Sequence, residues 1–500
     1  MMGIFWLVLY VAVSALLATA GLAVWRIYAS PASNIPGPAM AGATVWYEVY
    51  HWFVKDDWYE HLQTLHDRYG PVVRIGPNEV HFVDHEFCLR LHNRPDLLKC
   101  PTYYRPIRDL LGGIADPQRY RQRKALMKPL FRGETLLRYA SGTMNSLVEA
   151  LQARLLSEAA ASRGGHPTNL THIMWAFSAD VMTSYISGEA VGLGKLEGEA
   201  LVAAHEATRP YGIVHLAAIA HSVPLLMQAV DAFPALKRLT VIGWADKLAS
   251  IYLTGCGQGE SREKSQASRN HHIGIQLADR LKDKHLAHEE MTDIILAGAE
   301  GLLSNLIFLT HYMAQSPRTM DALRAELDNF SRNSCHGRHV WKDPGLLQLE
   351  YLDAVIRETT RLSAPWWHRL PRQSSTPVTY KGHVIPAKVS MSFTLRMLER
   401  DPTIFQDPES FIPERWLPSN PDAKRLKAAS VTFGVGNRIC LGYELSQQVL
   451  KKALSCIVQE LEFTICVPEG GPGYLGTYPT RNKAVNLEAQ LRPRSVSTRE

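Results

Sequence analysis

The sequence predicts a mainly α fold with small β-sheets (α+β), preceded by one N-terminal transmembrane helix. Helical patterns dominate residues 118–330. Segments at 69–83 and 378–393 have the alternation and bounding turns that are typical of short strands. Residues 4–25 contain no charged side chain. These observations together favour a helical body with small sheets and a membrane anchor.

Composition excludes several classes of protein. With 46% hydrophobic and 20% charged residues, the chain is neither disordered nor collagen-like. Its formal net charge of +6 comes without a dense run of Lys and Arg, so nothing indicates a nucleic-acid-binding stripe. The 7 cysteines are scattered and include no CxxC pair, which is typical of a reducing compartment.

The uncharged segment at the N-terminus is long enough to cross a bilayer. As a helix, residues 4–25 would span about 33 Å, against about 30 Å of hydrocarbon. The alternative is a cleaved signal peptide, with Ala18-Thr19-Ala20 as a passable cleavage site. No Lys or Arg precedes the apolar segment, which favours an uncleaved anchor. Arg26 follows it, so the positive-inside rule leaves the rest of the chain in the cytosol.

The expected domains are an anchor at 1–26, a proline-rich hinge at 27–40, a catalytic domain at 41–489 and a flexible tail at 490–500. We find no internal repeat and no linker that would separate independent domains. An apolar segment at 213–240 is interrupted by prolines. It is either core or a loop that dips into the membrane surface, and the sequence slightly favours the loop.

The strongest motif is FGVGNRICLG, which runs from Phe433 to Gly442. A lone cysteine is usually a small buried hydrophobe, but these neighbours favour another role for Cys440, as a thiolate ligand of iron. Gly434 and Gly436 permit the tight backbone approach that a flat macrocycle requires, and Gly442 would let the following helix, 443–458, run close to it. The guanidinium of Arg438 suits a carboxylate such as a haem propionate.

At this motif the chain resembles the cytochrome P-450 haem-thiolate monooxygenases in their membrane-anchored microsomal form. The resemblance runs from the anchor to about residue 487 and includes the family's ExxR, from Glu358 to Arg361, and its PERW segment with Arg415. It implies a Glu358–Arg361–Arg415 triad that clamps the cysteine loop, with haem b (iron protoporphyrin IX) as cofactor. It also implies that Arg369 holds a propionate.

Two motifs depart from the family's pattern. The aromatic and basic residues that contact the propionates correspond here to Tyr120 and Lys124, and lysine holds a carboxylate as a point charge without a fork. The alternative is that this basic helix is a solvated face.

The second departure lies in a long apolar helix at 289–315, which resembles the one that crosses the haem. Its signature runs Ala297-Gly298-Ala299-Glu300-Gly301, so the acid is present and Gly301 stands where the family has threonine. We expect Gly298 and Gly301 to provide space for oxygen or a local bulge. Three explanations stay open for the missing alcohol: Ser304 or water replaces it, a substrate hydroxyl does, or ordinary oxygen activation is absent. We favour a water- or substrate-assisted route with Glu300 as proton relay.

The resemblance implies a monooxygenase that inserts one oxygen atom from O2 into a hydrophobic small molecule. Electrons would come from NADPH through NADPH-cytochrome P-450 reductase, with cytochrome b5 as a further candidate donor, at the endoplasmic reticulum membrane. A basic docking face for the reductase is expected from Arg121, Arg123, Lys124, Lys128 and Arg438. The alternatives are a haem-thiolate isomerase or dehydratase that needs no reductase, suggested by Gly301, and a haem sensor without turnover.

Stretches such as YGPVVRIGPNEV and PERWL look most like fungal oxygenases of secondary metabolism, whose substrates include terpenoids, polyketides and indole alkaloids. Residues that line the substrate pocket cannot be told from core by sequence. The candidates for that lining are Ile107, Leu111, Ile295, Ala299, Trp366 and Trp367.

Overall fold

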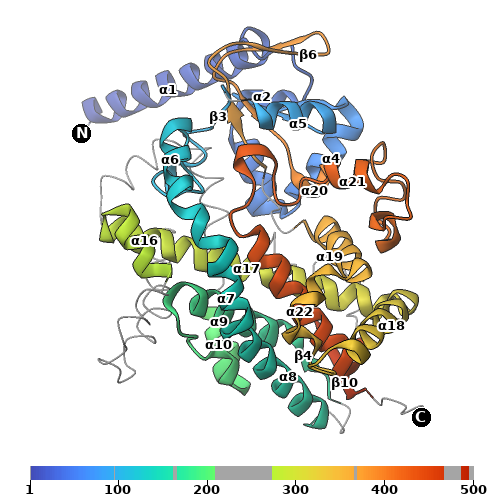
Figure 1. Ribbon diagram of the computed structural model, residues 1–500. Helices are drawn as coiled ribbons and strands as arrows, with labels where there is room; N and C mark the ends of the chain where they lie inside the picture. The colour runs from blue at the N-terminus through green and yellow to red at the C-terminus, as the bar shows by residue number, and fades with distance from the viewer. Residues whose placement is uncertain are drawn as a thin grey trace.

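The computed structural model describes residues 2–94, 96–161, 166–208, 273–364, 369–466 and 486–494. Two features expected from the sequence, the 213–240 segment and the pair Trp366 and Trp367, lie outside these residues. Within them the chain is mainly helical, with small sheets toward both ends of the molecule (Figure 1). The expected fold class is therefore confirmed.

A long central helix organises the body. α17, Lys284–Gln315, begins at Asp283, whose side chain accepts a hydrogen bond from the amide of Leu286, and it ends before Pro317. Its second half is buried on all sides, as expected for a helix in the middle of a large core. The principal helices around it are α6 (Pro117–Met127), α7 (Gly133–Ser141), α8 (Thr143–Ala161), α9 (Leu170–Ser187), α10 (Gly198–Thr208), α16 (Ile273–Leu281), α18 (Pro317–Asn333), α19 (Glu350–Ser363) and α22 (Tyr443–Glu460).

The largest sheet has five strands in the order β1-β2-β8-β5-β3. The hairpin of β1 and β2 turns at Pro77-Asn78, and β2 pairs with β8 in parallel, so residues some three hundred positions apart meet in one sheet. The strands are β1 (Val72–Gly76), β2 (Glu79–Phe82), β3 (Leu98–Lys99), β5 (Arg372–Gln373) and β8 (Ser390–Ser392). Short helices α2 (Ala39–Ala43), α3 (Trp46–Tyr50), α4 (Trp58–Tyr69), α5 (His85–Asn93), α20 (Leu395–Leu398) and α21 (Ala423–Ala429) lie at this end of the molecule (Figure 1).

Two smaller sheets complete the fold: β6 (Val378–Tyr380) with β7 (His383–Ile385), and β4 (Thr168–Asn169) with β10 (Glu488–Pro493) and β9 (Leu461–Cys466). The expectation of a frayed tail from Gln490 is wrong for its first residues. Residues 490–493 belong to β10 and pair with residues 461–464 of β9, and Leu491 is buried. Paired backbone and a buried side chain hold this segment in place.

The N-terminal apolar segment forms a single helix that projects from the body. α1, Met2–Tyr28, is exposed along Ile4 to Trp25, and its span from Ile4 has a mean hydropathy of 2.3 with none of it buried (Figure 1). α17 is also long and apolar enough to cross a membrane, but 67% of that span is buried, so it is a core helix. α1 is therefore the candidate membrane anchor.

The segment after α1 is tied to the first strand. The guanidinium of Arg74 donates to the carbonyl of Arg26 (2.9 Å) and to the hydroxyl of Ser30 (3.0 Å). The Arg74 amide donates to the carbonyl of Pro36 (2.7 Å), and any side chain at Gly37 would clash with the Arg74 backbone. These contacts fix the direction in which the proline-rich hinge leaves the body.

Candidate active site

The cysteine loop enters from α21 and leads into α22. It closes on itself through a hydrogen bond from the Cys440 amide to the Phe433 carbonyl (2.7 Å). Gly434 and Gly436 have φ values of +73° and +61°, a left-handed conformation that side chains rarely adopt. The two glycines are thus required by the turn that presents the cysteine.

The thiol of Cys440 is accessible, although the protein surrounds it. Burial is the main influence on it and raises its pKa, while a hydrogen bond from the Gly442 amide and the charge of Lys124 act in the opposite direction. An accessible group inside a dense part of the fold faces an interior space. A thiol placed in this way can meet a ligand from inside the molecule, and a metal cation there would favour its thiolate.

Tyr120 and Lys124, both on α6, hold the cysteine loop from one side. The Tyr120 hydroxyl donates to the carbonyl of Asn437 (3.2 Å), and the Lys124 ammonium donates to the carbonyls of Asn437 (2.6 Å) and Ile439 (3.0 Å). Burial lowers the pKa of Lys124 to about 8. In this structure both side chains therefore bind loop carbonyls, where the sequence indicated propionates.

The structure brings Glu358, Arg361 and Arg415 together. The Glu358 carboxylate accepts two hydrogen bonds from Arg361 (2.9 and 2.8 Å) and one from Arg415 (3.1 Å). The Trp416 indole and the Ile412 amide donate to the same carboxylate, and all three charged residues are buried. Arg361 also binds three backbone carbonyls, at residues 399, 408 and 410. The group joins α19 to the chain that leads toward the cysteine loop, which is a structural role.

Arg369 does not lie free to meet a propionate, and this expectation is corrected. Its guanidinium is buried between two carboxylates, Glu48 (2.6 and 2.9 Å) and Glu79 (2.5 Å). These two charges raise its pKa well above the ordinary value, against the opposing effect of burial. The pairs join α3 and β2 to the segment before β5, so Arg369 stabilises the fold.

The cation that sequence reasoning missed is Arg372, three residues later on β5. It is buried, and among the described residues no carboxylate forms an ion pair with it, with Arg438 or with Lys99. Burial, with a smaller contribution from the charge of Arg372, lowers the pKa of Arg438 to about 10. The same two effects lower the pKa of Lys99. We call Lys99, Arg372 and Arg438 the cationic cluster.

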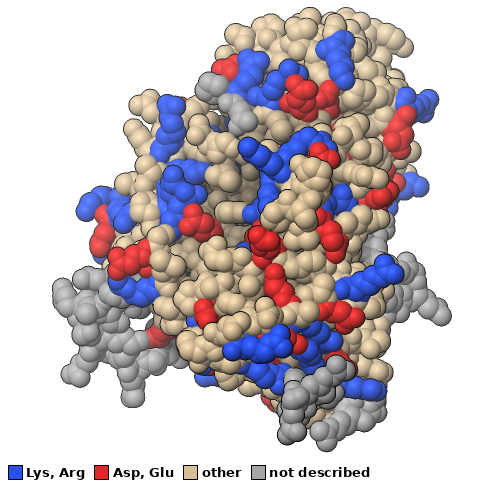
Figure 2. Space-filling model, turned by 45° about the vertical axis from the view of Figure 1, so that its right-hand side comes forward, with Lys and Arg blue, Asp and Glu red and all other residues tan. Residues whose placement is uncertain are grey.

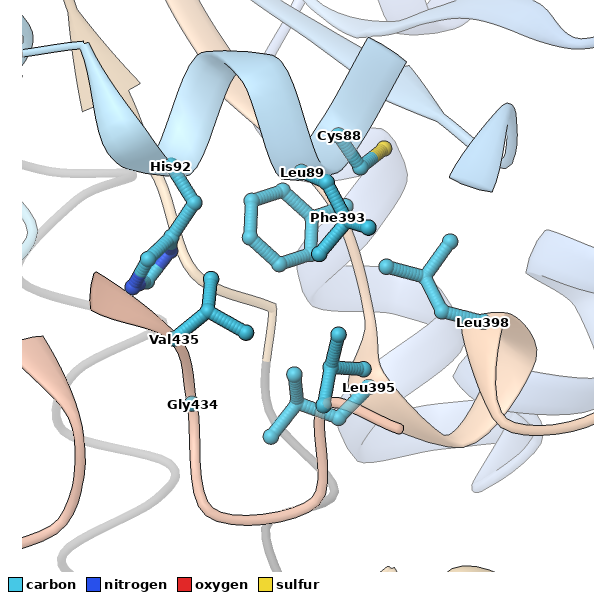
Figure 3. A pocket seen from close by; sticks show the side chains of 9 residues that line it. Cys88, Leu89, His92, Phe393, Leu395, Leu398, Gly434 and Val435 are labelled. Carbon is cyan, nitrogen blue, oxygen red and sulfur yellow. The ribbon is translucent and has the colours of Figure 1, made fainter. Parts of the chain in front are cut away.

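Polar groups without partners accompany this cluster. Both ring nitrogens of His92 and the hydroxyl of Tyr104 are buried and have no hydrogen-bond partner among the described residues. Burial, followed by the charges of Arg372 and Lys99, lowers the pKa of His92 to about 3. Figure 3 shows His92 on α5 beside Val435 of the cysteine loop, at a small pocket whose other side chains are apolar or Cys88. Buried polar groups without partners, beside cations that have no carboxylate partner, indicate a missing anionic group.

Three of the accessible positions on α17 lie four residues apart. Ala297 is exposed although it lies in the middle of the helix, and Asp293 and Gly301 are half-buried. Because residues four apart share a helix face, these three form one stripe, which we call the open stripe. A side chain at Gly301 would meet no atom within 4 Å, so the space expected beside it is present.

Three expectations for α17 are corrected. Gly298 packs against α9, since a Cβ there would lie 2.6 Å from the sulfur of Met182, and it does not provide space for oxygen. Ile295 and Ala299 are 1% and 4% exposed and belong to the main core, so they do not line a pocket. The helix runs through residues 297–301 without a bulge. Ile107 and Leu111 are half-buried and remain candidates for the lining.

Polar groups flank the site of the missing alcohol. Glu300 is half-buried, and the hydroxyl of Ser304 is buried without a hydrogen-bond partner among the described residues. The Asn305 amide, which sequence reasoning missed, donates to the Gly301 carbonyl (2.8 Å) and accepts a hydrogen bond from Ser363 on α19 (2.7 Å). Asn305 therefore fixes α17 at the position where the family's threonine is absent.

The expected basic docking face is smaller than the sequence indicated. Only Arg121 and Lys128 are exposed. Arg123 is paired with the buried carboxylate of Glu290 (2.6 Å), and Lys124 is bound to the cysteine loop. Figure 2 shows basic and acidic side chains interspersed on the face that it presents.

Comparison with known proteins agrees with this site. The cytochrome P450 family model matches residues 40–473. The chain is 28% identical to a cytochrome P450 monooxygenase of Sordaria araneosa, covering 89% of each chain. It is 28% identical to another of Eupenicillium brefeldianum, covering 85% of this chain and 86% of the other. It is 26% identical to a tryptophan 6-hydroxylase of Fusarium equiseti, covering 89% and 88%. The chain therefore belongs to the cytochrome P450 family of haem-binding monooxygenases.

Proposed function

We propose that the chain inserts one oxygen atom from O2 into a hydrophobic small molecule of secondary metabolism, with Cys440 as the axial ligand of haem b. The observation that carries this proposal is the accessible thiol of Cys440 next to a cationic cluster that has no acidic partner. When bound, the haem supplies the oxygen chemistry, since a thiolate ligand favours cleavage of the O–O bond.

The residues present fit the haem's two carboxylates. Arg372, Arg438 and Lys99 would hold them, and the unpartnered nitrogens of His92 offer a further hydrogen bond. Because ionised partners make the stronger hydrogen bonds, carboxylates would offset the cost of burying Arg372 beside two half-buried cations. Tyr120 and Lys124 would then act through the loop carbonyls that they bind, which keep Cys440 in position.

Proton delivery has to use groups other than a helix alcohol. The open space beside Gly301 suits a water molecule, with Glu300 as relay and the Ser304 hydroxyl as a further partner. Gly301→Thr should therefore lower the hydrogen peroxide released per NADPH consumed, without abolishing turnover. If that ratio is unchanged in the variant, the assignment of the space to a proton-carrying water is wrong.

Electrons would come from NADPH through NADPH-cytochrome P-450 reductase, or in part through cytochrome b5. Arg121 and Lys128 are the exposed cations near the cysteine side that would meet an acidic partner. α1 would anchor the protein in the endoplasmic reticulum membrane with the catalytic domain in the cytosol, because Arg26 follows the apolar segment.

The alternative function is a haem-thiolate isomerase or dehydratase that needs no reductase. Gly301 is the observation that favours it, since the alcohol lost there serves oxygen activation. The left-handed glycines and closed hydrogen bond of the cysteine loop support the monooxygenase.

Two experiments test the proposal. The reduced carbon-monoxide complex should show its Soret band at the thiolate position, and Cys440→Ala should remove that band. If the band survives in the variant, Cys440 is not the ligand. Metabolites are then compared by mass between a producing host and the same host without the gene. A substrate that is lighter by one oxygen than the lost product supports monooxygenation, whereas equal masses support the isomerase.

A further inference from the structure

A carboxylate without a partner lies on the open stripe of α17. Asp293 is one helical turn before Ala297, on the same face, and is half-buried. Among the described residues it has no hydrogen bond or ion pair, and it lies beside Gly112, where a Cβ would be 3.7 Å from the Asp293 Oδ2 atom. Asp293 is thus an acceptor that faces the interior space without a donor.

The contrast with Glu290, one turn earlier on α17, shows that this is particular to Asp293. The Glu290 carboxylate is buried but satisfied, since Arg123 donates to it (2.6 Å) and so does the Leu111 amide (3.0 and 3.2 Å). The fold therefore neutralises Glu290 and leaves Asp293 open.

Lys99, the cation whose charge acts on Asp293, does not neutralise it. Lys99 attracts it, but the Lys99 ammonium donates to the carbonyl of Gly112 and forms no ion pair with the carboxylate. Burial and the neighbouring charge of Glu290 raise the pKa of Asp293 to about 7. If the cationic cluster holds the haem carboxylates, the charge of Lys99 is offset there, and Asp293 lacks compensation altogether.

We propose that Asp293 binds a cationic nitrogen of the substrate, so that the substrates of this enzyme are hydrophobic amines. This inference rests on the proposed function, because it takes the open stripe as the wall of the substrate site. Side chains one turn apart are about 5–6 Å from each other, so the bound nitrogen would lie about that far along α17 from Ala297. A cation would remove the cost of an unpaired carboxylate in a site largely shielded from water.

The test measures binding by the haem-loaded full-length protein. The probe is a phenylbutyl trimethylammonium ion, whose quaternary nitrogen cannot ligate iron, and its partner is the uncharged isostere with carbon in place of nitrogen. Binding is followed by the change in the Soret absorption. We expect the native protein to prefer the cation by about tenfold or more, since an interaction with a charged group contributes about 1.5–3 kcal/mol and 1.4 kcal/mol is tenfold.

Asp293→Asn should abolish this preference and leave binding of the isostere unchanged. Asp279→Asn, an equal change of charge on the exposed face of α16, is the matched control and should keep the preference. No preference in the native protein, or one that survives Asp293→Asn, would overturn the proposal. A native protein that binds the corresponding alcohol as tightly as the cation would overturn it too, since Asp293 would then serve neutral donors.

A second measurement does not depend on the variant's folding. In the native protein, affinity for the cation should rise between about pH 5 and about pH 8 as the carboxyl ionises, while affinity for the isostere stays level. The charged groups that face Asp293 are Glu290 and Lys99, and Glu290 is held by Arg123. A level profile for the cation would overturn the proposal. The carbon-monoxide band of the native protein separates the two conclusions: its absence defeats the proposed function, and its presence without a preference defeats only this inference.

Discussion

Arg369 and Arg372 lie three residues apart, but replacing each by methionine should have different effects. Arg369→Met should lower the stability of the fold, and Arg372→Met should weaken the binding of haem. Arg369→Met removes the guanidinium that both Glu48 and Glu79 contact, at 2.5–2.9 Å, in a buried place. Breaking a buried ion pair by removing one partner costs about 3–5 kcal/mol, because the remaining charge stays uncompensated. Here two carboxylates remain, so we expect the haem-free protein to lose at least that much free energy of unfolding.

Arg372→Met should change the free energy of unfolding of the haem-free protein by no more than about 1 kcal/mol. No carboxylate in the described part of the chain pairs with Arg372, and its positive charge repels that of Arg438. The variant should instead release haem faster. Loss of one hydrogen bond to a charged group, about 1.5–3 kcal/mol, corresponds to roughly 10- to 100-fold.

The assay pairs urea unfolding of the haem-free variants with the rate of haem transfer to a scavenging protein. Glu79→Gln combined with Arg369→Met is the control, and it should recover part of the lost stability because one uncompensated charge is gone. If Arg369→Met is as stable as the native protein, the two carboxylates are not what Arg369 holds. If Arg372→Met loses stability and keeps its haem, the cationic cluster is not the haem's carboxylate site.

Three further outcomes are expected. Gly298→Ala should destabilise the protein by about 1–3 kcal/mol because the methyl group meets Met182, whereas Gly301→Ala meets nothing and should stabilise α17 by up to about 1 kcal/mol; urea unfolding of the matched pair decides. Glu358→Gln should lower the free energy of unfolding by about 3–5 kcal/mol, since two buried arginines lose their counter-charge. An unchanged unfolding transition in calorimetry would contradict this. Asp293→Asn should raise the unfolding temperature of the ligand-free protein at about pH 8 but not at about pH 4. Because burial raises the pKa of Asp293 from 3.8 to about 7, ionisation costs the folded state stability as pH rises through that interval, and equal shifts at both pH values would contradict this.

Sequence patterns predicted best those features whose partners are close along the chain. The cysteine loop needed its glycines at fixed offsets, and the Glu358–Arg361 pair lies on one helical turn. The strands at 72–82 also followed from alternation and a turn. In each case the local sequence contains the whole physical reason for the structure.

Arg369 and Gly298 were misassigned because their partners are distant. Nothing near residue 369 indicates Glu48, which reaches it from a five-residue helix more than three hundred positions earlier. Likewise, only the packing of α9 on α17 brings Met182 against Gly298. The tail was a different error, since Leu487, Ala489 and Leu491 alternate with polar residues and this signal for β10 was available.

The two unusual features of this enzyme, the unpaired carboxylate of Asp293 and the missing alcohol at Gly301, lie at opposite ends of the open stripe. At a rise of 1.5 Å per residue, Asp293 and Gly301 lie about 12 Å apart along α17. An ammonium group bound to Asp293 therefore cannot take the place of the missing alcohol at Gly301. The space beside Gly301 is thus left to another group, such as the water that we propose there, with the Ser304 hydroxyl and Glu300 next to it. Binding of the substrate's charge and delivery of protons then become independent functions of one helix face, because groups this far apart without shared partners act additively.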